Sequence, residues 1–83
     1  LDARKVSICF ETPHVSGALY NMLGHFIYNH VNMLMIQSRP ILERNWEYRF
    51  FLDIEGSLSD GPVQNALLGL KNEAVFMRIL GNY

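Results

Sequence analysis

The chain carries two short segments whose residue types could hold a small polar ligand. The first is Ser16-Gly17-Ala18-Leu19, at the junction between a predicted strand and a predicted helix. The start of a helix offers backbone N–H groups without intrahelical partners, which bind anions, and glycine lets a ligand approach the backbone closely. We therefore expect an anionic group such as a carboxylate to bind at this junction.

The second segment, residues 31–40, is apolar except for Asn32 near its start and Gln37-Ser38-Arg39 near its end. It stops at Pro40, as a strand that leaves a sheet would. The residue before a proline is held in extended conformation, so the guanidinium of Arg39 projects from a constrained backbone. The amide of Asn32 can both donate and accept a hydrogen bond. The segment is thus a predicted strand with polar groups at both ends.

Length and composition indicate one globular domain, and we assign residues 1–83 to it. Of its 83 residues, 49% are hydrophobic and 18% are charged, which is typical of a globular rather than a disordered chain. Its longest apolar run is far too short to span a bilayer. The formal net charge of −1 provides no basic field to hold a phosphate backbone. The composition therefore disfavours both membrane and nucleic acid as partners.

The first residue and the single cysteine indicate what kind of chain the domain comes from and in which compartment it lies. The chain begins at Leu1 without an initiator Met or a signal-type apolar region, so we expect a fragment of a longer chain. Cys9 is the one cysteine, which excludes an internal disulfide and is typical of a reducing compartment. His14, His25 and His30 form no pair with zinc-site spacing. We expect a cytoplasmic protein without a metal or a cofactor.

Hydrophobic periodicity and turn residues predict six elements. They are a half-buried strand around residues 6–10, a helix that starts after Ser16 as N-cap and ends at 29–30, strands over 31–39 and 48–55, a helix after Asp60 as N-cap, and a strand over 75–80 closed by Gly81-Asn82. Each helix shows apolar residues three and four positions apart, and each strand shows alternation.

The order βαββαβ predicts an α+β fold, the ferredoxin-like sandwich. Two right-handed crossovers place both helices on one face of an antiparallel four-stranded sheet with the strand order 4-1-3-2. Residues 31–39 then form an edge strand that is long and apolar and has no lysine to prevent pairing. We expect a homodimer, or a larger assembly, joined along this edge.

Several apolar side chains are predicted on the sheet face that has no helices. Phe51, Phe76 and Leu80 point there by alternation, and so does one of the neighbours Leu34 and Met35. A large exposed apolar surface marks a contact with another domain or subunit. We expect a partner to cover this face.

The chain resembles the ACT domain at the C-terminus of prephenate dehydratases. That family carries a Gly-Ala-Leu motif, which stands here as Gly17-Ala18-Leu19, and a Glu-Ser-Arg-Pro motif, which stands here as Gln37-Ser38-Arg39-Pro40. The resemblance covers nearly the whole chain and continues through Trp46-Glu47-Tyr48, Asp53-Ile54-Glu55-Gly56, Val63-Gln64-Asn65-Ala66-Leu67 and Leu80-Gly81-Asn82-Tyr83. Each motif alone is weak evidence, but together they are specific.

The resemblance implies an allosteric domain that binds L-phenylalanine between two ACT domains and inhibits an attached dehydratase, as feedback inhibition in phenylalanine biosynthesis. The ligand contacts that it implies are Ser16, Gly17, Ala18, Leu19, Asn32, Gln37, Ser38, Arg39 and Pro40. Asn32 matches an asparagine common in ligand-binding ACT domains. Gln37 stands where the family has Glu, which removes a charge, and Ser16 stands where proline is frequent. The Thr-Arg-Phe motif of the catalytic domain is absent, so we expect this chain to sense and not to catalyse.

Three other functions share this topology. The regulatory ACT domain of an aromatic amino-acid hydroxylase has both motifs, but residues 63–67 and 80–83 favour the dehydratase, either alone or fused to a chorismate mutase. An acylphosphatase needs an arginine in the loop after the first strand, and residues 11–20 contain none. An RNA-binding module needs basic and aromatic residues on the central strands, where Phe51 fits but its acidic neighbours do not.

Structural roles remain open for the same residues. Gly17 could serve an ordinary helix-entry turn, and Arg39 could be a solvated charge that pairs with Glu43 or Glu47. A ferredoxin-like interaction module without enzymatic function is the corresponding alternative for the whole chain.

Overall fold

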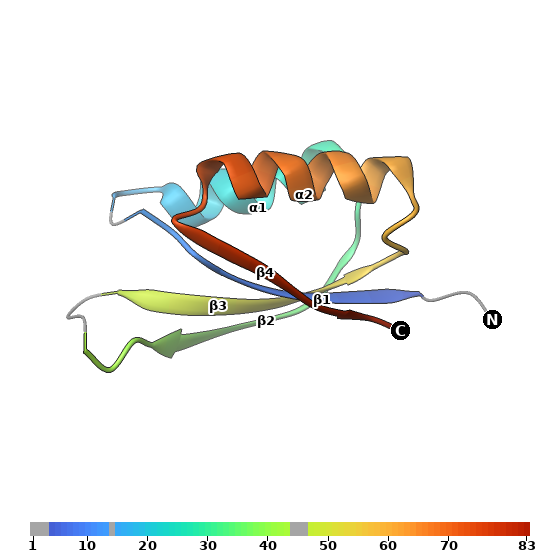
Figure 1. Ribbon diagram of the computed structural model, residues 1–83. Helices are drawn as coiled ribbons and strands as arrows, with labels where there is room; N and C mark the ends of the chain where they lie inside the picture. The colour runs from blue at the N-terminus through green and yellow to red at the C-terminus, as the bar shows by residue number, and fades with distance from the viewer. Residues whose placement is uncertain (1–3, 14, 44–46) are drawn as a thin grey trace.

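Four strands and two helices follow one another in the predicted βαββαβ order (Figure 1). The computed structural model describes residues 4–13, 15–43 and 47–83. The elements are β1 (Lys5–Glu11), α1 (Ala18–Tyr28), β2 (Met33–Pro40), β3 (Tyr48–Glu55), α2 (Gly61–Glu73) and β4 (Phe76–Asn82). Leu1, His14 and Trp46, which were named from the sequence, lie outside the described residues.

The strands form one antiparallel sheet in the order β2-β3-β1-β4, with both helices on the same side of it (Figure 1). This confirms the ferredoxin-like α+β fold and the predicted strand order. β2 is an edge strand, as expected. The opposite side of the sheet carries Cys9, Arg49, Phe51, Phe76 and Arg78 by the strand register, and we call it the open face.

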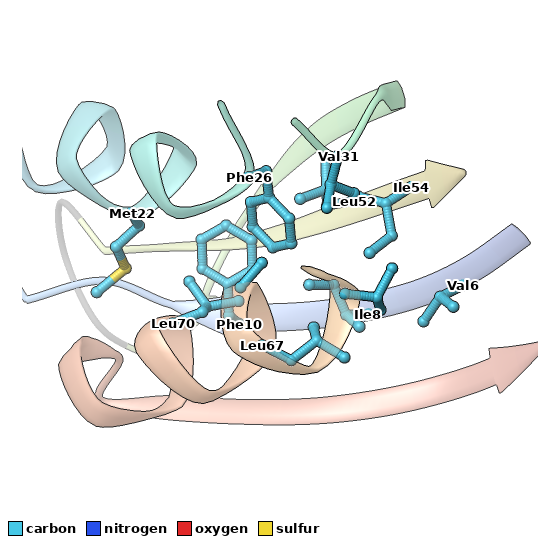
Figure 2. Packing of buried hydrophobic residues seen from close by; sticks show 12 residues of the cluster. Val6, Ile8, Phe10, Met22, Phe26, Val31, Leu52, Ile54, Leu67 and Leu70 are labelled. Atoms are coloured by element: carbon cyan, nitrogen blue, oxygen red, sulfur yellow. The ribbon is translucent and has the colours of Figure 1, made fainter. Parts of the chain in front are cut away.

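The central strand β1 supplies the middle of the hydrophobic core (Figure 2). Its residues Val6, Ile8 and Phe10 point toward the helices and are 0% exposed. On the open face the intervening residues are buried as well: Ser7, Cys9 and Glu11. The prediction of a half-buried strand is therefore wrong, because neighbouring side chains of β3, β4 and the C-terminus cover the second face of β1.

The start of α1 depends on the backbone conformation of Gly17. This residue occupies the N-cap position with φ of 78°, in the left-handed region, and no side chain caps the helix. The prediction that Ser16 is the N-cap is therefore wrong. An L-residue with a Cβ would raise the energy of that conformation by roughly 1–2 kcal/mol, which is why glycine stands here.

α2 begins as predicted after Asp60, with Pro62 in the first turn. The Asp60 carboxylate does not cap the helix but accepts a hydrogen bond from the N–H of Ser57 at 2.9 Å. Four apolar residues of α2 are buried against the sheet and α1, at the predicted positions: Val63, Ala66, Leu67 and Leu70. The amphipathic pattern therefore predicted the buried side of this helix correctly.

The two helices approach each other closely where Gly69 faces His25. A Cβ atom at Gly69 would overlap the His25 ring. The same ring places its Nε2 2.6 Å from Oε1 of Glu73, so it joins α1 to the last turn of α2. The His25 ring therefore limits how closely the two helices approach each other at Gly69.

β2 is shorter at its start than the sequence predicted. Val31 is not in the strand but is buried in the core, where its N–H donates to the carbonyl of Phe26. The register shifts between Met33 and Met35, which leaves Leu34 as an extra residue in a bulge. Because a bulge reverses the alternation, Met33 pairs with the core-facing Ile54 while Met35 belongs to the open face.

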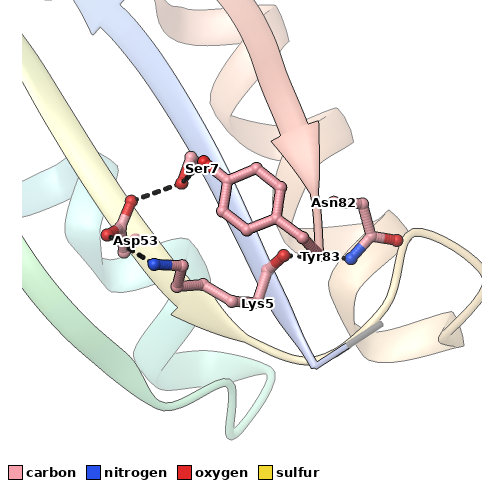
Figure 3. Close-up of polar contacts among 5 residues, drawn as sticks. All are labelled: Lys5, Ser7, Asp53, Asn82 and Tyr83. Atoms are coloured by element: carbon pink, nitrogen blue, oxygen red, sulfur yellow. Dashed lines mark hydrogen bonds and ion pairs between the residues drawn. The ribbon is translucent and has the colours of Figure 1, made fainter. Parts of the chain in front are cut away.

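β4 extends two residues beyond its predicted end, because the C-terminus is tied to the start of β1. Asn82 accepts a hydrogen bond at Oδ1 from the N–H of Leu58 and donates from Nδ2 to the carbonyl of Lys5, both at 3.0 Å. The Tyr83 hydroxyl donates to Ser7 Oγ at 3.2 Å, and Ser7 donates to Asp53 at 2.6 Å (Figure 3). This network covers the open face over Ser7.

Candidate ligand site at the start of α1

A pocket of ≈ 400 Å³ lies where β1 leads into α1. Its walls are the turn before the helix, the first turn of the helix and the start of β3. The lining residues are Thr12, Pro13, Val15, Ser16, Gly17, Ala18, Leu19, Tyr20, Glu47, Tyr48 and Phe50. The volume is within the range of roughly 300–1,000 Å³ that is typical of small-molecule sites. Four of the predicted contact residues, Ser16 to Leu19, lie together here.

The chemistry of this pocket suits a ligand with a negative group and an apolar group. The first N–H groups of α1 lack intrahelical partners, and the first turn contains no acidic residue. The N–H of Ala18 donates to the Val15 carbonyl at 3.2 Å, so the groups left for a ligand are those of Leu19 and Tyr20. The positive end of the helix dipole is therefore available to a carboxylate. Phe50 provides an aromatic wall, stacked on Phe10 with 5.6 Å between ring centroids.

Asn32 lies at the other end of α1 from this pocket. α1 has 11 residues, so its two ends are about 16 Å apart. The Asn32 side chain is exposed, and its backbone carbonyl accepts the N–H of Glu55 at 2.8 Å. Within one chain, Asn32 therefore does not join Gly17 at a common site.

The predicted contacts at the end of β2 divide between the two faces of the sheet. Pro40 pairs with Tyr48, so this end of β2 lies at the same end of the sheet as the pocket. Ser38 pairs with the core-facing Phe50 and so points to the helix side. Gln37 and Arg39 alternate with it and point to the open face.

Arg39 has a different neighbour from those considered from the sequence. Its guanidinium lies over the Phe51 ring, 5.7 Å from the centroid, and no ion pair with Glu43 or Glu47 occurs within 4 Å among the residues that the structure describes. Arg39 and Pro40 line a second hollow of ≈ 620 Å³ with Ile41 and Leu42. This hollow is separate from the pocket at α1.

Sequence reasoning missed several wall residues of the pocket, among them Thr12, Glu47 and Tyr48. A signal for Tyr48 and Phe50 was present, because alternation placed both on the helix side of β3. Placing them beside Gly17 needed the pairing of Glu11 with Arg49, which sets the end of β1 against the start of β3.

Among the described residues no group of three or more His, Cys, Asp and Glu side chains could hold a metal ion. No helix in the described part of the chain is long and apolar enough to cross a membrane.

Comparisons with known proteins find relatives among chorismate mutase/prephenate dehydratases and arogenate dehydratases. No family model matches it. It is 39% identical over 79 residues to the bifunctional chorismate mutase/prephenate dehydratase of Aquifex aeolicus, which covers 95% of this chain and 22% of that protein. The chain thus spans about a fifth of the length of the curated relatives that it matches.

Solved structures share the fold as well. A prephenate dehydratase from Arthrobacter aurescens, in complex with L-Phe, superposes with a TM-score of 0.88 and 34% identity over 98% of this chain and 27% of that chain. GqqA, a quorum quenching acylase, superposes with a TM-score of 0.90 and 28% identity over 98% of this chain and 42% of that chain.

Proposed function

We propose that this chain, an ACT domain of the kind found at the C-terminus of prephenate dehydratases, binds L-phenylalanine for feedback inhibition of that enzyme. The matched part of the relatives lies away from their catalytic domain, so the chain is a regulatory part and not the catalytic one. The attached dehydratase domain and the cytoplasmic location belong to the same proposal.

One observation carries the proposal: the Gly17-Ala18-Leu19 segment lines a pocket of ≈ 400 Å³ at a helix start. The carboxylate of an amino acid would accept hydrogen bonds from the N–H groups of Leu19 and Tyr20 in the first turn of α1. Its ring would lie against the apolar wall beside Phe50. The Arthrobacter aurescens protein in complex with L-Phe supports this ligand.

A two-fold dimer along β2 would complete the site. A two-fold axis at this edge runs the partner's β2 antiparallel to β2 and also reverses the direction of α1. Asn32 of one protomer would then face the start of α1 in the other protomer. The length of α1 that separates Asn32 from Gly17 within one chain would no longer keep them apart. The edge is suited to pairing, since Leu34, Met35 and Ile36 are 39–49% exposed.

The outer side of α1 would extend this interface. Its exposed residues Tyr20, Ile27 and Tyr28 border a hollow of ≈ 420 Å³ on the helix surface. Another hollow, of ≈ 280 Å³, lies between Leu23 and the bulged part of β2. Hollows beside exposed apolar side chains are the complementary features that a self-pairing surface requires.

Titration calorimetry with L-phenylalanine, L-tyrosine and L-tryptophan tests the ligand directly. We expect heat and a rise in the thermal midpoint with L-phenylalanine. Sedimentation over a concentration series tests the dimer, and ligand should favour the dimer because binding and association are linked. No heat and no change in the midpoint at millimolar L-phenylalanine, with the dimer intact, would refute the assignment of the ligand.

A further inference from the structure

The open face carries aromatic rings with arginine side chains above them. The guanidinium of Arg39 lies over Phe51. Those of Arg49 and Arg78 lie over Phe76, 5.3 and 5.9 Å from its centroid. The surface expected from the sequence to be apolar is therefore cationic and aromatic. We call Arg39, Arg49, Phe51, Phe76 and Arg78 the arginine patch.

The three arginines of the patch are not equivalent. Arg49 donates to Glu11 Oε2 from Nη2 at 2.7 Å and from Nε at 3.1 Å, and the Glu11 side chain is 6% exposed. Arg39 and Arg78 are exposed, and neither forms an ion pair with a carboxylate within the part of the chain that the structure describes. Their guanidinium carbons lie 5.7 and 5.9 Å from the ring centroids of Phe51 and Phe76, and both side chains are accessible to solvent.

The charge of the patch differs from that of the remaining chain. We also count the underlying Glu11 in the patch, so its three arginines and one carboxylate give it a formal charge of +2. The whole chain has a formal charge of −1, so everything outside the patch sums to −3. Two patches brought face to face would repel each other, which disfavours a second copy as the occupant.

We propose that the arginine patch is a docking surface for an acidic helix of a partner protein, whose carboxylates pair with Arg39 and Arg78. Phe51 on β3 and Phe76 on β4 are two strand spacings apart across the sheet and two residues apart along it, which gives about 12 Å. Carboxylates at positions i and i+7 of a helix have nearly this separation, about 10.5 Å. Apolar side chains at i+3 and i+4 of that helix would reach the rings between them.

Two physical reasons favour a protein helix over nucleic acid. Arginine and aromatic residues carry most of the binding energy in protein interfaces, and a guanidinium held on a ring loses less entropy when it pairs with a carboxylate. By contrast, Glu11 lies in the middle of the patch and Asp53 lies farther along the same face, which opposes a phosphate backbone.

A labelled helical peptide measures this docking without knowledge of the natural partner. The probe is a hydrocarbon-stapled helix with Glu at i and i+7 and Leu at i+3 and i+4. Its binding is measured by fluorescence anisotropy. We expect it to bind the 83-residue protein, more weakly as the salt concentration rises. A peptide with its two Glu residues at i and i+4 should bind at least fivefold more weakly.

Variants of the protein identify the contact residues. Replacing both outer arginines, Arg39→Gln with Arg78→Gln, should weaken peptide binding at least tenfold. The matched control, Arg4→Gln with Lys71→Gln, also removes two positive charges but none from the patch, and should keep binding within about twofold, since screened distant charges contribute little. Circular dichroism confirms that both proteins fold; all four side chains are exposed, at least in part.

Four results would overturn the proposal. They are no binding of the i, i+7 peptide by the parent at low salt, equal binding by the Arg39/Arg78 variant, tighter binding of a single-stranded RNA oligonucleotide that the same variant loses, and self-association in sedimentation that Arg78→Gln alone, away from the β2 edge, abolishes. The third result would assign the patch to nucleic acid and the fourth to a second copy of the chain.

Discussion

The guanidinium of Arg49 forms two hydrogen bonds with the buried carboxylate of Glu11, across the pair of central strands. Register places the two residues directly opposite each other at the ends of β1 and β3. The same end of the sheet leads into the turn that forms the pocket at α1. This ion pair therefore joins the two strand ends that carry the pocket residues Thr12 and Phe50.

Replacing Arg49 should destabilise the fold more than replacing an exposed arginine does. Arg49→Gln removes both hydrogen bonds and the ion pair that Arg49 makes with the 6% exposed carboxylate of Glu11, at a cost of about 1–3 kcal/mol. Arg78→Gln, which removes a similar contact with Phe76 but no ion pair, should cost less than about 1 kcal/mol. Urea unfolding of both variants gives the comparison, and equal midpoints would contradict the role assigned to the pair.

Gly69 should be intolerant of even a methyl group. In Gly69→Ala the new Cβ displaces the His25 ring from its contact with Glu73, and we expect a loss of about 1–3 kcal/mol in the free energy of unfolding. In a His25→Ala background the obstacle is gone, and the same change should have little effect or a stabilising one, because alanine favours the helix. A penalty that is the same in both backgrounds would show that the two side chains do not interact.

Asn32→Ala tests the site shared between two chains. If the Asn32 amide bonds the charged head group of the ligand, its loss should weaken L-phenylalanine binding by about 1.5–3 kcal/mol, roughly ten- to a hundredfold. The stability of the protein should change much less, since the side chain is exposed. Asn65→Ala, at an exposed position on α2, is the matched control. Calorimetry that finds parental affinity in a folded, dimeric Asn32→Ala protein would remove Asn32 from the site.

Two substitutions at Gly17 distinguish the effect of backbone strain on folding from the effect of a side chain on ligand binding. A Cβ at Gly17 meets no atom within 4 Å, so the cost of a side chain comes from its φ of 78°. Gly17→Asn should fold with a small loss, because Asn tolerates the left-handed region, while Gly17→Val should lose about 1–2 kcal/mol or more. Both should impair ligand binding, because both block approach to the backbone. Normal binding by Gly17→Asn would show that the ligand does not approach there.

The sequence by itself determined which elements form, in what order, and which residues of β1, β3 and α2 face the core. Alternation at Val6, Ile8 and Phe10 and the helical spacing of Val63, Ala66 and Leu70 are local signals, and the buried residues follow them. The topology then followed from the handedness of the two crossovers. The segment Ser16-Gly17-Ala18-Leu19 also marked four residues that do share a pocket.

Only the tertiary structure decided how the remaining candidate residues are distributed. The bulge at Leu34 shifts the alternation of β2 by one residue, which places Arg39 on the open face beside Phe51 instead of on the helix side. The length of α1 separates Asn32 from Gly17. A bulge, a register and the distance between two ends of a helix arise from pairing between residues far apart in the chain, so no local pattern in the sequence contains them.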